Sequence, residues 1–573
     1  MTLWRPLPIL KQCDMKRYVF LILLLFIQII SFCQYRIDWQ NCYGTEEDDE
    51  VFAITETEDG FIVTGQYCDD PTYRITKGVT LRIDHHGDTI WQKIKNTDND
   101  NGVEYIDRLT DGDYIMMYQD LLLYPNAHYG NVGFRRIDVD GNTIWEKAYG
   151  NSFGRTIGVF RGCATSDGDF VGCAPYNQAG GDISHYWGGR NDVWVVKIDG
   201  NGDMVWETSV GTTGSEGASS IQQTADGGFL ISITNGVPGV GNMNCKEQQE
   251  INGTPYLVKL TPDGNVEWSF CYGGSYFTNI QDVVVLNDGY LLYGATTADD
   301  GDFEGAGYHL GYHAGIPTHQ RLGDVYLMKT DFDFNIIWCR CYGGRGDDCP
   351  TKVFQNDDGG FTVFAATHSI DGDVQSSCLM QHDPHYYIGL HSEVSWIFRV
   401  DHNGELLWER IAGNSNNLYT GTYPCDVIKH NDKEYTVASQ MTYYEPGWET
   451  YDINCPYNAN MPGSGINFWV YHITDIFDYD NVGEIEDNEN AVSLEIHPNP
   501  ANTWVAVDYT LPEGFNNAVI TLTNSMGIEV YTQNVHGERG QNVIDLQKLP
   551  VGVYILTIKC EEHRLTEKVV VTR

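Results

Sequence analysis

A tryptophan that returns six times at similar intervals is the strongest constraint on the fold of this chain. Each of these tryptophans ends a similar segment, such as VVKIDGNGDMVW (195–206) and LVKLTPDGNVEW (257–268). The positions are Trp91, Trp145, Trp206, Trp268, Trp338 and Trp408, with spacings of 54, 61, 62, 70 and 70 residues. A recurrence of this kind indicates an architecture built from repeated units.

An Asp-Gly pair just before an aromatic residue recurs in the same units. It occurs as DGF (59–61), DGDY (111–114), DGDF (167–170), DGGF (226–229), DGY (288–290) and DGGF (358–361), with NDKEY (431–435) as a degenerate seventh. The pair supplies the positive φ angles of a two-residue hairpin turn, and its flanks alternate apolar with polar residues as half-buried strands do. The sequence therefore predicts an all-β fold of four-stranded units, which is typical of β-propeller blades.

The numbers of turns and of tryptophan strands predict how such a ring would close. Seven Asp-Gly-type hairpins are followed by only six tryptophan strands, because the seventh unit ends at NFWVYHI (467–473). The missing strand matches RIDWQNCYG (36–44), whose end resembles WEKAYG (145–150). We therefore expect a seven-bladed β-propeller over residues 34–474, with the N-terminal strand paired to the segment around Trp469 so that no sheet edge stays free.

Two recurring features have structural explanations. The tryptophans recur in every unit, whereas a binding site would occur once, so they are interpreted as packing between blades. Asp138, Asp140 and Asn142 resemble the start of a calcium loop, as do residues 199–203, but neither segment continues to the Glu that an EF-hand requires. We interpret them as turn residues. Calcium stays an alternative, while the sequence itself predicts no cofactor and no metal.

The N-terminal region has the order of parts found in a secretory signal peptide. A basic pair (16–17) precedes an apolar run (19–30), and the sequence SFCQ follows it. We expect a signal peptide over residues 1–33, with cleavage between Cys33 and Gln34.

Two further expectations concern this leader and the mature chain. Met15 lies directly before the basic pair, so we expect translation to start there. A lipoprotein signal with Cys33 acylated is the less favoured alternative, because Phe32 is bulky where such signals have a small residue. No other apolar stretch approaches the about 20 residues of a membrane helix, so we expect no transmembrane segment in the mature protein.

The chain carries a large excess of acidic residues. Lys and Arg number 35 and Asp and Glu 79, which gives a formal net charge of −44. Such a field repels phosphate backbones, so nucleic acid is not an expected partner. Of the 15 cysteines, two lie in the leader. Cys163 and Cys173 flank the turn at 166–169 almost symmetrically, so a disulfide between them and two free thiols are equal alternatives.

In a four-stranded meander, the loops between the second and third strands share one face with the links between blades. These loops lengthen along the chain beyond what a connection needs, which marks this face as the working one. Their aromatic rings could stack on sugar faces, or they could form small cores for the long loops. The candidate ligand-binding residues are Tyr186, Trp187, Tyr308, Tyr312, Tyr386, Tyr387, Tyr443, Tyr444 and Trp448.

Two of the same loops are also rich in histidine. A metal site there is less favoured than exposed loop histidines, because a four-residue step aligns ligands only on a helix and this segment is rich in Gly. The residues concerned are His309, His313, His319, His382, Asp383, His385 and His391. The sequence contains no nucleophile elbow, phosphate-binding loop or zinc-protease helix, so no catalytic residues are assigned.

A second domain follows the repeats. Residues 475–491 are acidic and without periodicity, and we interpret them as a solvated linker. Residues 492–573 then alternate as about seven short strands, which predicts a small β-sandwich of the immunoglobulin-like kind.

Four motifs follow one another in this last domain: HPNPA (497–501), SMG (525–527), IDLQKLPVGVYILTI (544–558) and KVVVTR (568–573). Together they resemble the type IX secretion C-terminal sorting domain of Bacteroidota. The resemblance implies export across the outer membrane, recognition by the secretion machinery, removal by a sortase-like protease, and release or surface attachment. It assigns to the sorting signal Pro498, Asn499, Pro500, Gly527, Gly552, Tyr554 and Lys568. Residues 36–473 also resemble the DGGF- and YGG-containing repeats common in proteins with this tail.

These features predict an exported surface protein whose propeller is a non-enzymatic binding or adhesion module for a glycan or another surface protein. A secreted hydrolase or lyase acting on polysaccharide is the alternative, and a rigid spacer is a third. A deep pocket with converging carboxylates would favour the enzyme, whereas a broad aromatic surface would favour binding.

Overall fold

The computed structural model describes residues 35–45, 49–70, 75–95, 100–121, 130–150, 160–237, 241–243, 245, 254–309, 323–369, 371–374, 393–412, 421–443, 465–475, 493–497, 501–511, 515–523, 529–549, 552–560 and 563–571. The chain divides into two compact units, one over Ile37–Ile476 and one that contains Phe477–Arg573.

The first unit is built from four-stranded antiparallel sheets, which we number in chain order. Sheet 1 contains β2 (Glu50–Glu56), β3 (Gly60–Asp70), β4 (Ile75–Asp84) and β5 (Thr89–Ile94). Sheet 2 contains β6 (Asp100–Arg108), β7 (Tyr114–Leu121), β8 (Gly130–Ile137) and β9 (Thr143–Tyr149). Sheet 3 contains β10 (Arg161–Ala164), β11 (Phe170–Tyr176), β12 (Asp192–Ile198) and β13 (Met204–Val210). Sheet 4 contains β14 (Gly217–Gln223), β15 (Phe229–Gly236), β16 (Thr254–Leu260) and β17 (Val266–Cys271).

The remaining sheets of this unit follow the same order of strands. Sheet 5 contains β18 (Asp282–Val285), β19 (Tyr290–Thr296), β20 (Asp324–Thr330) and β21 (Ile336–Tyr342). Sheet 6 contains β22 (Asp348–Gln355), β23 (Phe361–Thr367), β24 (Val394–Val400) and β25 (Leu406–Ala412). Sheet 7 contains β26 (Gly421–Asn431), β27 (Glu434–Tyr443), β28 (Gly465–Asp475) and β1 (Tyr35–Tyr43). Within the described residues the single helix is a 3₁₀ turn, η1 (Gly301–Phe303).

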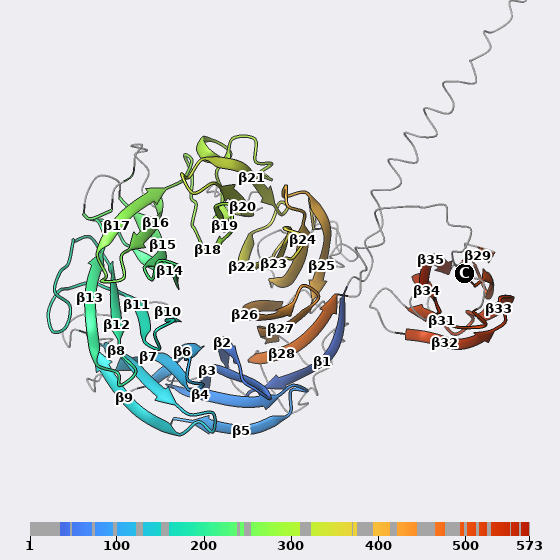
Figure 1. Cartoon of the computed structure of the whole chain (residues 1–573), viewed down its shortest axis with the longest axis horizontal. Helices are drawn as coiled ribbons and strands as arrows, with labels where there is room; N and C mark the ends of the chain where they lie inside the picture. The colour runs from blue at the N-terminus through green and yellow to red at the C-terminus, as the bar shows by residue number, and fades with distance from the viewer. Residues whose placement is uncertain are drawn as a thin grey trace, which may run out of the picture. The chain divides into compact units, whose positions relative to one another are not determined.

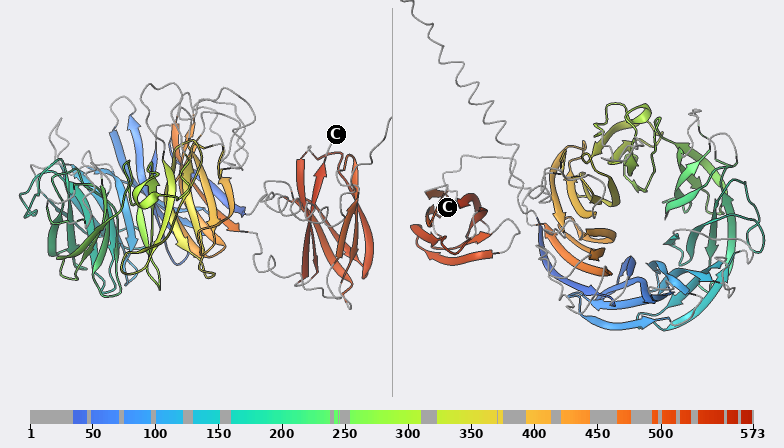
Figure 2. Two further views of the ribbon diagram at one scale, coloured as in Figure 1. Left: turned by 90° about the horizontal axis from the view of Figure 1, so that it is seen from above. Right: turned by 180° about the vertical axis from the view of Figure 1, so that it is seen from behind.

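The sheets of this unit lie around a ring, each with its first strand toward the centre (Figure 1). The strands run roughly along the axis of the ring, as the side view in Figure 2 shows. The blue strand β1 lies beside the orange strand β28 and is hydrogen-bonded to it, so the first and last described strands of the unit share one sheet. The indole Nε1 of Trp469 in β28 donates to Oε1 of Gln40 in β1 at 3.0 Å. The all-β architecture is therefore as predicted.

Four of the six Asp-Gly turns differ from the predicted two-residue form, whereas those at 57–60 and 286–289 have two-residue loops. At Asp167-Gly168 the backbone N–H of Thr165 donates to the carbonyl of Asp169 at 2.9 Å, and that of Gly168 donates to Thr165 at 3.0 Å. Only the Gly has a positive φ, of 88°. This is a three-residue loop, in which a type I turn is followed by a left-handed Gly. The two-residue prediction is wrong here because the Asp keeps an ordinary backbone conformation.

The recurring tryptophans pack between sheets, which confirms that part of the sequence analysis. The indole Nε1 of Trp91 in sheet 1 donates to the carbonyl of Val139 in sheet 2 at 3.2 Å. Trp145 reaches Gly200 in sheet 3 in the same way, at 3.0 Å. Trp206 and Trp338 bond to the carbonyls of Pro262 and His402 in the same way. These four indoles thus cover the last turn of the following sheet, and each N–H satisfies a turn carbonyl.

The turn interpretation of the calcium-like segments also holds. Both the backbone N–H and the side-chain amide of Asn142 donate to the carboxylate of Asp138, at 2.8 and 2.9 Å. The backbone N–H of Asp203 donates to Asp199 at 2.8 Å. These carboxylates therefore cap their own turns.

The second unit is a sandwich of two sheets. One sheet contains β29 (Ser493–His497), β30 (Trp504–Thr510) and β33 (Arg539–Asp545). The other contains β32 (Glu529–His536), β31 (Asn517–Thr523), β34 (Gly552–Cys560) and β35 (His563–Val571), in that order. Buried side chains of both sheets form one apolar core, which includes Val507, Ile544, Ile520, Leu556 and Val569.

The cysteines follow a different pattern from the one considered. The β10–β11 register places Cys163 opposite Val171 and Cys173 opposite Arg161, so the two sulfurs do not face each other. Both thiols are free. The disulfide alternative is wrong because the hairpin is centred one residue away from the assumed turn. A disulfide instead joins Cys245 and Cys271 in sheet 4.

No helix within the described ranges is both long enough and apolar enough to cross a membrane.

Candidate functional site

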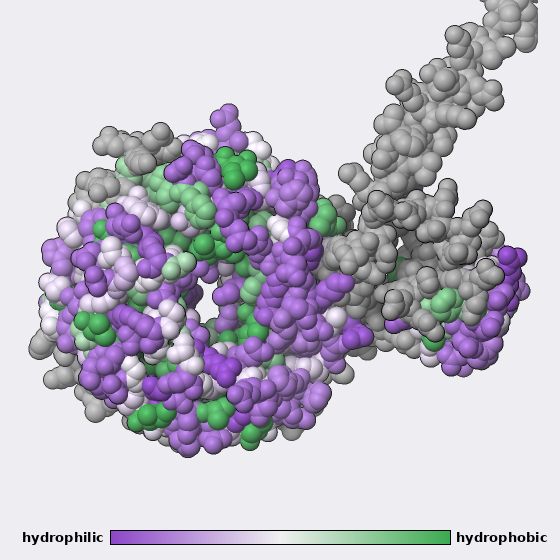
Figure 3. Space-filling model, viewed as in Figure 1, coloured by the Kyte–Doolittle hydropathy of each residue, from purple (hydrophilic) through white to green (hydrophobic). Residues whose placement is uncertain are grey.

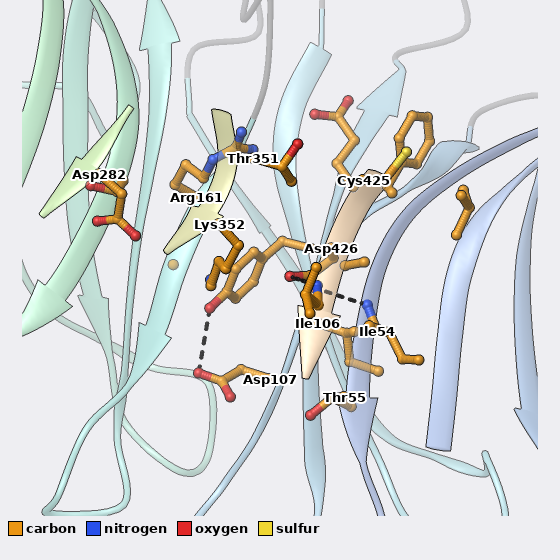
Figure 4. Close-up of a pocket in the computed structure, with 18 of the residues that line it drawn as sticks. Ile54, Thr55, Ile106, Asp107, Arg161, Asp282, Thr351, Lys352, Cys425 and Asp426 are labelled. Carbon is orange, nitrogen blue, oxygen red and sulfur yellow. Dashed lines mark hydrogen bonds between the residues drawn. The ribbon is translucent and has the colours of Figure 1, made fainter. Parts of the chain in front are cut away.

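A cavity lies at the centre of the ring and is lined mainly by the first strands of the sheets. Its volume is about 750 Å³, and the opening is visible in the space-filling view of Figure 3. The charged residues of its wall are Glu50, Glu104, Asp107, Arg161, Asp282, Lys352 and Asp426. We call this cavity the channel; Figure 4 shows how several of its side chains converge from different sheets.

The channel is polar because each first strand has one unpaired edge. An inner edge strand exposes backbone N–H and C=O groups that need partners. The carboxylate of Asp426 in sheet 7 accepts from the N–H of Ile54 in sheet 1 at 3.1 Å, as Figure 4 shows. The carboxylate of Asp107 in sheet 2 accepts from the N–H of Ala164 in sheet 3 at 2.8 Å. Acidic side chains thus tie the inner edges of sheets 7 and 2 to the next sheet.

Other polar side chains do the same work between other sheets. The guanidinium Nε of Arg161 donates to the carbonyl of Ser219 in sheet 4 at 2.7 Å. The hydroxyl of Thr351 in sheet 6 donates to the carbonyl of Pro424 in sheet 7 at 2.8 Å. Many polar groups of the channel wall therefore stabilise the fold. Groups that could bind a ligand are those that still have unused hydrogen-bonding capacity.

Two charged groups of the wall have such capacity. The Lys352 side chain has no hydrogen-bond or ion-pair partner among the described residues. Glu104 accepts one hydrogen bond, from the N–H of Phe160 at 3.1 Å. Burial raises the pKa of Glu104 to about 7, and neighbouring Glu50 adds to the rise, while the hydrogen bond and Arg161 oppose it. Among the described residues, the channel therefore combines an ammonium that has no hydrogen-bonded partner with a carboxyl whose pKa is raised to about 7.

The end of the channel nearest the long loops is lined by amides. Gln66, Gln119 and Gln440 lie near the ends of the second strands β3, β7 and β27, and they line the cavity. The amide Nε2 of Gln66 donates to Oε2 of Glu50 at 2.6 Å. Successive strands are antiparallel, so this end shares a face with the loops that join second to third strands.

Replacement of Glu104 by Gln is expected to change how stability depends on pH. A carboxyl whose pKa is raised in the native state contributes stability that is complete below its unfolded pKa of about 4.3 and is lost as the pH rises through about 7. Above pH 7 the native protein holds a buried carboxylate, which costs up to about 3 kcal/mol. Urea denaturation should therefore show that E104Q is more stable than wild type at pH 8, that this advantage falls to about 1 kcal/mol at pH 5, and that it disappears below pH 4. Equal pH profiles of the two proteins would contradict the assignment.

Three of the predicted aromatic residues lie in the described part of the long loops. The Tyr186 hydroxyl donates to the carbonyl of Gly189 at 2.9 Å, and the Trp187 N–H donates to Asp192 at 2.5 Å. Tyr308 packs on the apolar cluster of sheets 4 and 5. All three are half-buried and held by their own loops. Tyr443 ends β27, but its side chain, like Tyr312, Tyr386, Tyr387, Tyr444 and Trp448, lies outside the described residues, as do Cys33 and Gln34.

Sequence analysis missed the channel. Its signal was present: the first strand of each unit carries charged or amide residues at positions where the other strands are apolar. Such residues look like an ordinary solvated face, since a sequence does not tell which edge of a sheet turns toward a ring centre.

Metal ligation finds no support in the described residues, where no group of three His, Cys, Asp or Glu side chains is placed to hold an ion. Of the predicted histidines only His309 is described, and its Nδ1 lies 3.0 Å from the buried carboxylate of Asp324. This contact ties the loop to the start of β20. The other histidines of the two loops lie outside the described residues.

The sandwich of the second unit decides where the protein goes. Residues 495–572 match the secretion system C-terminal sorting domain. The protein is exported by type IX secretion to the cell surface or the extracellular space. The match covers all the predicted sorting residues. Gly552 lies at the start of β34, and Tyr554 lies in the core of the domain, where it is 3% exposed. Lys568 lies in β35 opposite Ile555, while Pro498, Asn499, Pro500 and Gly527 lie outside the described residues.

Comparisons of the whole chain with other proteins show only distant similarities. No curated protein sequence matches the chain. Among solved structures, a PL25 ulvan lyase is 10% identical over 74% of this chain and 95% of its own, with a TM-score of 0.39. The arabinofuranosidase Arb93A of Fusarium graminearum is 9% identical over 64% and 91%, with a TM-score of 0.31. A Trypanosoma rangeli sialidase mutant is 7% identical over 85% and 86%, with a TM-score of 0.29. Similarities this low carry no argument about the activity of the chain.

Proposed function

We propose that the first unit is a closed seven-bladed propeller whose channel binds a neutral glycan at the surface of the cell that exports it. The observation that carries this proposal is the mixed character of the channel wall, which presents carboxylates, amides, a guanidinium and an ammonium within one cavity of about 750 Å³. Sugar hydroxyls both donate and accept hydrogen bonds, so a wall with both kinds of group suits them. A strongly cationic ligand would be repelled by Lys352, and a strongly anionic ligand would be repelled by the carboxylates.

The aromatic loops extend this site in the proposal. They share the face of the ring where the amide-lined end of the channel lies, so Tyr186, Trp187 and the further predicted rings would bind sugar units that leave the channel. The protein acts as a binding or adhesion module without a cofactor. Its sorting domain is recognised by the type IX machinery of a Bacteroidota cell and removed by a sortase-like protease.

The test is glycan binding by the purified full-length chain, measured on an array of neutral surface oligosaccharides and then by calorimetry. Replacement of Lys352 by Met is expected to weaken binding at least tenfold, because the ammonium has no structural partner among the described residues to lose. Lys147→Met is the matched control, since that side chain is exposed and paired with Asp203 on the outside of the ring. Binding lost in Trp187→Ala but retained in K352M would overturn the channel site, and binding to no glycan would overturn the function.

One observation favours an enzyme as the second candidate. Glu104 is a carboxyl with a pKa of about 7 in a cavity that holds further carboxylates, which is the pairing that a glycosidic cleavage requires. If the channel cleaves its glycan, the appearance of new reducing ends is expected to fall at least a hundredfold in E104Q while binding is kept. If the wild-type chain binds a glycan without cleaving it, the enzyme is excluded and the binding module is the remaining function.

A further inference from the structure

The junction between sheets 1 and 2 departs from the pattern of the other junctions. In four outer strands the fourth residue after the recurring tryptophan position is a tyrosine, and its hydroxyl donates to a carbonyl in the last turn of the following sheet. These tyrosines are Tyr43, Tyr149, Tyr272 and Tyr342. After Trp91 the corresponding residue is Lys95. In sheets 3 and 6 the corresponding residues are the apolar Val210 and Ala412, so this junction differs in placing a cation where the other outer strands have a tyrosine or an apolar residue.

A second departure puts another cation into the same gap. Arg135 in β8 pairs in register with Glu146, the residue after the tryptophan of β9. In the five other sheets with a described register, the corresponding residue is apolar: Leu81, Val196, Val258, Met328 and Phe398. Arg135 is 7% exposed. Burial of a guanidinium is costly, so its presence at a position that is otherwise apolar needs a reason.

A third departure removes a carboxylate. Two residues after the tryptophan, Lys147 and Arg340 face carboxylates of the following turns, Asp203 at 2.6 Å and Glu405 at 2.5 Å. At the junction of sheets 1 and 2, Lys93 faces the neutral amide of Asn142 at 3.3 Å. All three departures raise the positive charge at one place in a chain of net charge −44.

The result is a pocket of about 240 Å³ between the two sheets. Trp91, Met116 and Ile137 contribute an apolar floor, while Lys93, Lys95 and Arg135 contribute cations. Among the described residues of its lining the single carboxylate is Glu146, which accepts from Lys95 at 2.5 Å and from Arg135 at 3.0 Å.

Two of the three cations of this pocket lie over the ring of Tyr118, while Lys93 lies 5.3 Å from the ring centre of Trp91. The Lys95 ammonium lies 4.9 Å and the Arg135 guanidinium 4.6 Å from the ring centre of Tyr118. Tyr118 has room because Gly133 stands beneath it, where a Cβ would clash with the ring at 2.3 Å. The positive side chains are thus fixed before any ligand arrives, which lowers the entropy cost of binding.

We propose that this pocket binds an acidic sugar residue, with its charged group at Lys93, Lys95 and Arg135 and the apolar face of its ring on Trp91. Within the described part of the lining, three cations against one carboxylate leave a net positive charge. The pocket shares no residue with the channel, so it does not depend on the function proposed there. A carboxylated sugar and a sulfated sugar supply the same anionic chemistry.

The test measures binding of glucuronate, glucose 6-sulfate and glucose to the purified full-length chain by ligand-observed NMR titration. Both anionic sugars are expected to bind at least tenfold more tightly than glucose, and their ratio distinguishes carboxylate from sulfate recognition. Added salt is expected to weaken both. Equal binding of all three sugars would overturn the proposal.

Two variants make the test specific. Lys95→Tyr restores the residue found at four other junctions, so the variant is expected to fold with an unchanged melting temperature and to bind at least tenfold less tightly. Asn142→Asp gives Lys93 a carboxylate and is expected to have the same effect. Asn335→Asp is the matched control, because the Asn335 amide donates to Asp331 as that of Asn142 does to Asp138. Wild-type affinity in both K95Y and N142D would sink the proposal.

Discussion

A chain that begins at residue 45 is expected to lose at least about 5 kcal/mol of unfolding free energy relative to one that begins at residue 35. The difference between the two is β1, the outer strand of sheet 7. Without it the backbone of β28 loses its hydrogen-bonding neighbour, and Trp469, which is 0% exposed, loses the Gln40 oxygen that binds its indole. Few terminal segments of this length contribute so much to the free energy of unfolding, because most chain termini do not form a strand of a sheet.

The contacts between β1 and sheet 1 add to this loss. The amide of Asn41 donates to the carbonyl of Gly87 at 2.8 Å, and Trp39 packs on the apolar cluster that sheets 1 and 7 share. Urea denaturation followed by circular dichroism measures the difference between the two chains. Asp38→Asn serves as the control, since it keeps the strand and changes only one side chain, which contacts Thr474 and His472. Equal denaturation midpoints for the long and short chains would contradict the role given to β1.

Replacement of Trp396 by Ala is expected to cost about 4 kcal/mol. This indole is 0% exposed in the core between sheets 5 and 6, and its Nε1 donates to Oε2 of Glu409 at 3.1 Å. Truncation leaves a cavity the size of an indole and a carboxylate that is 9% exposed and has lost a donor.

The two parts of that cost can be separated. Trp396→Phe retains part of the ring volume but removes the donor, and combining it with Glu409→Gln removes the charge left behind. The double variant is expected to be more stable than W396F alone. Ile337→Ala, at a side chain 54% exposed, is the surface control and should change the free energy by less than about 0.5 kcal/mol. A W396A variant no less stable than I337A would contradict the prediction.

The repeats could be predicted from the sequence because each marker residue has a structural role within its own unit or at the next one. Trp91 and Trp145 recur since each must reach the turn of the next sheet, and the Asp-Gly pairs recur since each hairpin needs one left-handed residue. The match of residues 36–44 to later outer strands pointed to the pairing of β1 with β28. The turn length and the register of Cys163 were mispredicted because they depend on a single residue of offset, which composition does not reveal.

The candidate sites were harder to predict because they depend on where side chains meet. The carboxylates of Asp107 and Asp426 lie on strands that look half-exposed in sequence, and only the ring turns them toward one cavity. The pocket between sheets 1 and 2 left a readable trace, in that Lys95 stands where other units have Tyr. Departures from a repeat are informative once the structure shows what the regular residue does at that place.

The buried thiols have a consequence for how this protein reaches its destination. Burial raises the pKa values of Cys173, Cys339, Cys349 and Cys425 to about 12. At neutral pH only on the order of one such sulfur in 10⁵ is a thiolate, so these four thiols react slowly with oxidants in the folded chain. The unfolded chain has no such protection. In an oxidising compartment the chain must therefore bury these sulfurs before they are oxidised. Chains that fold more slowly than this would be trapped as cross-linked forms.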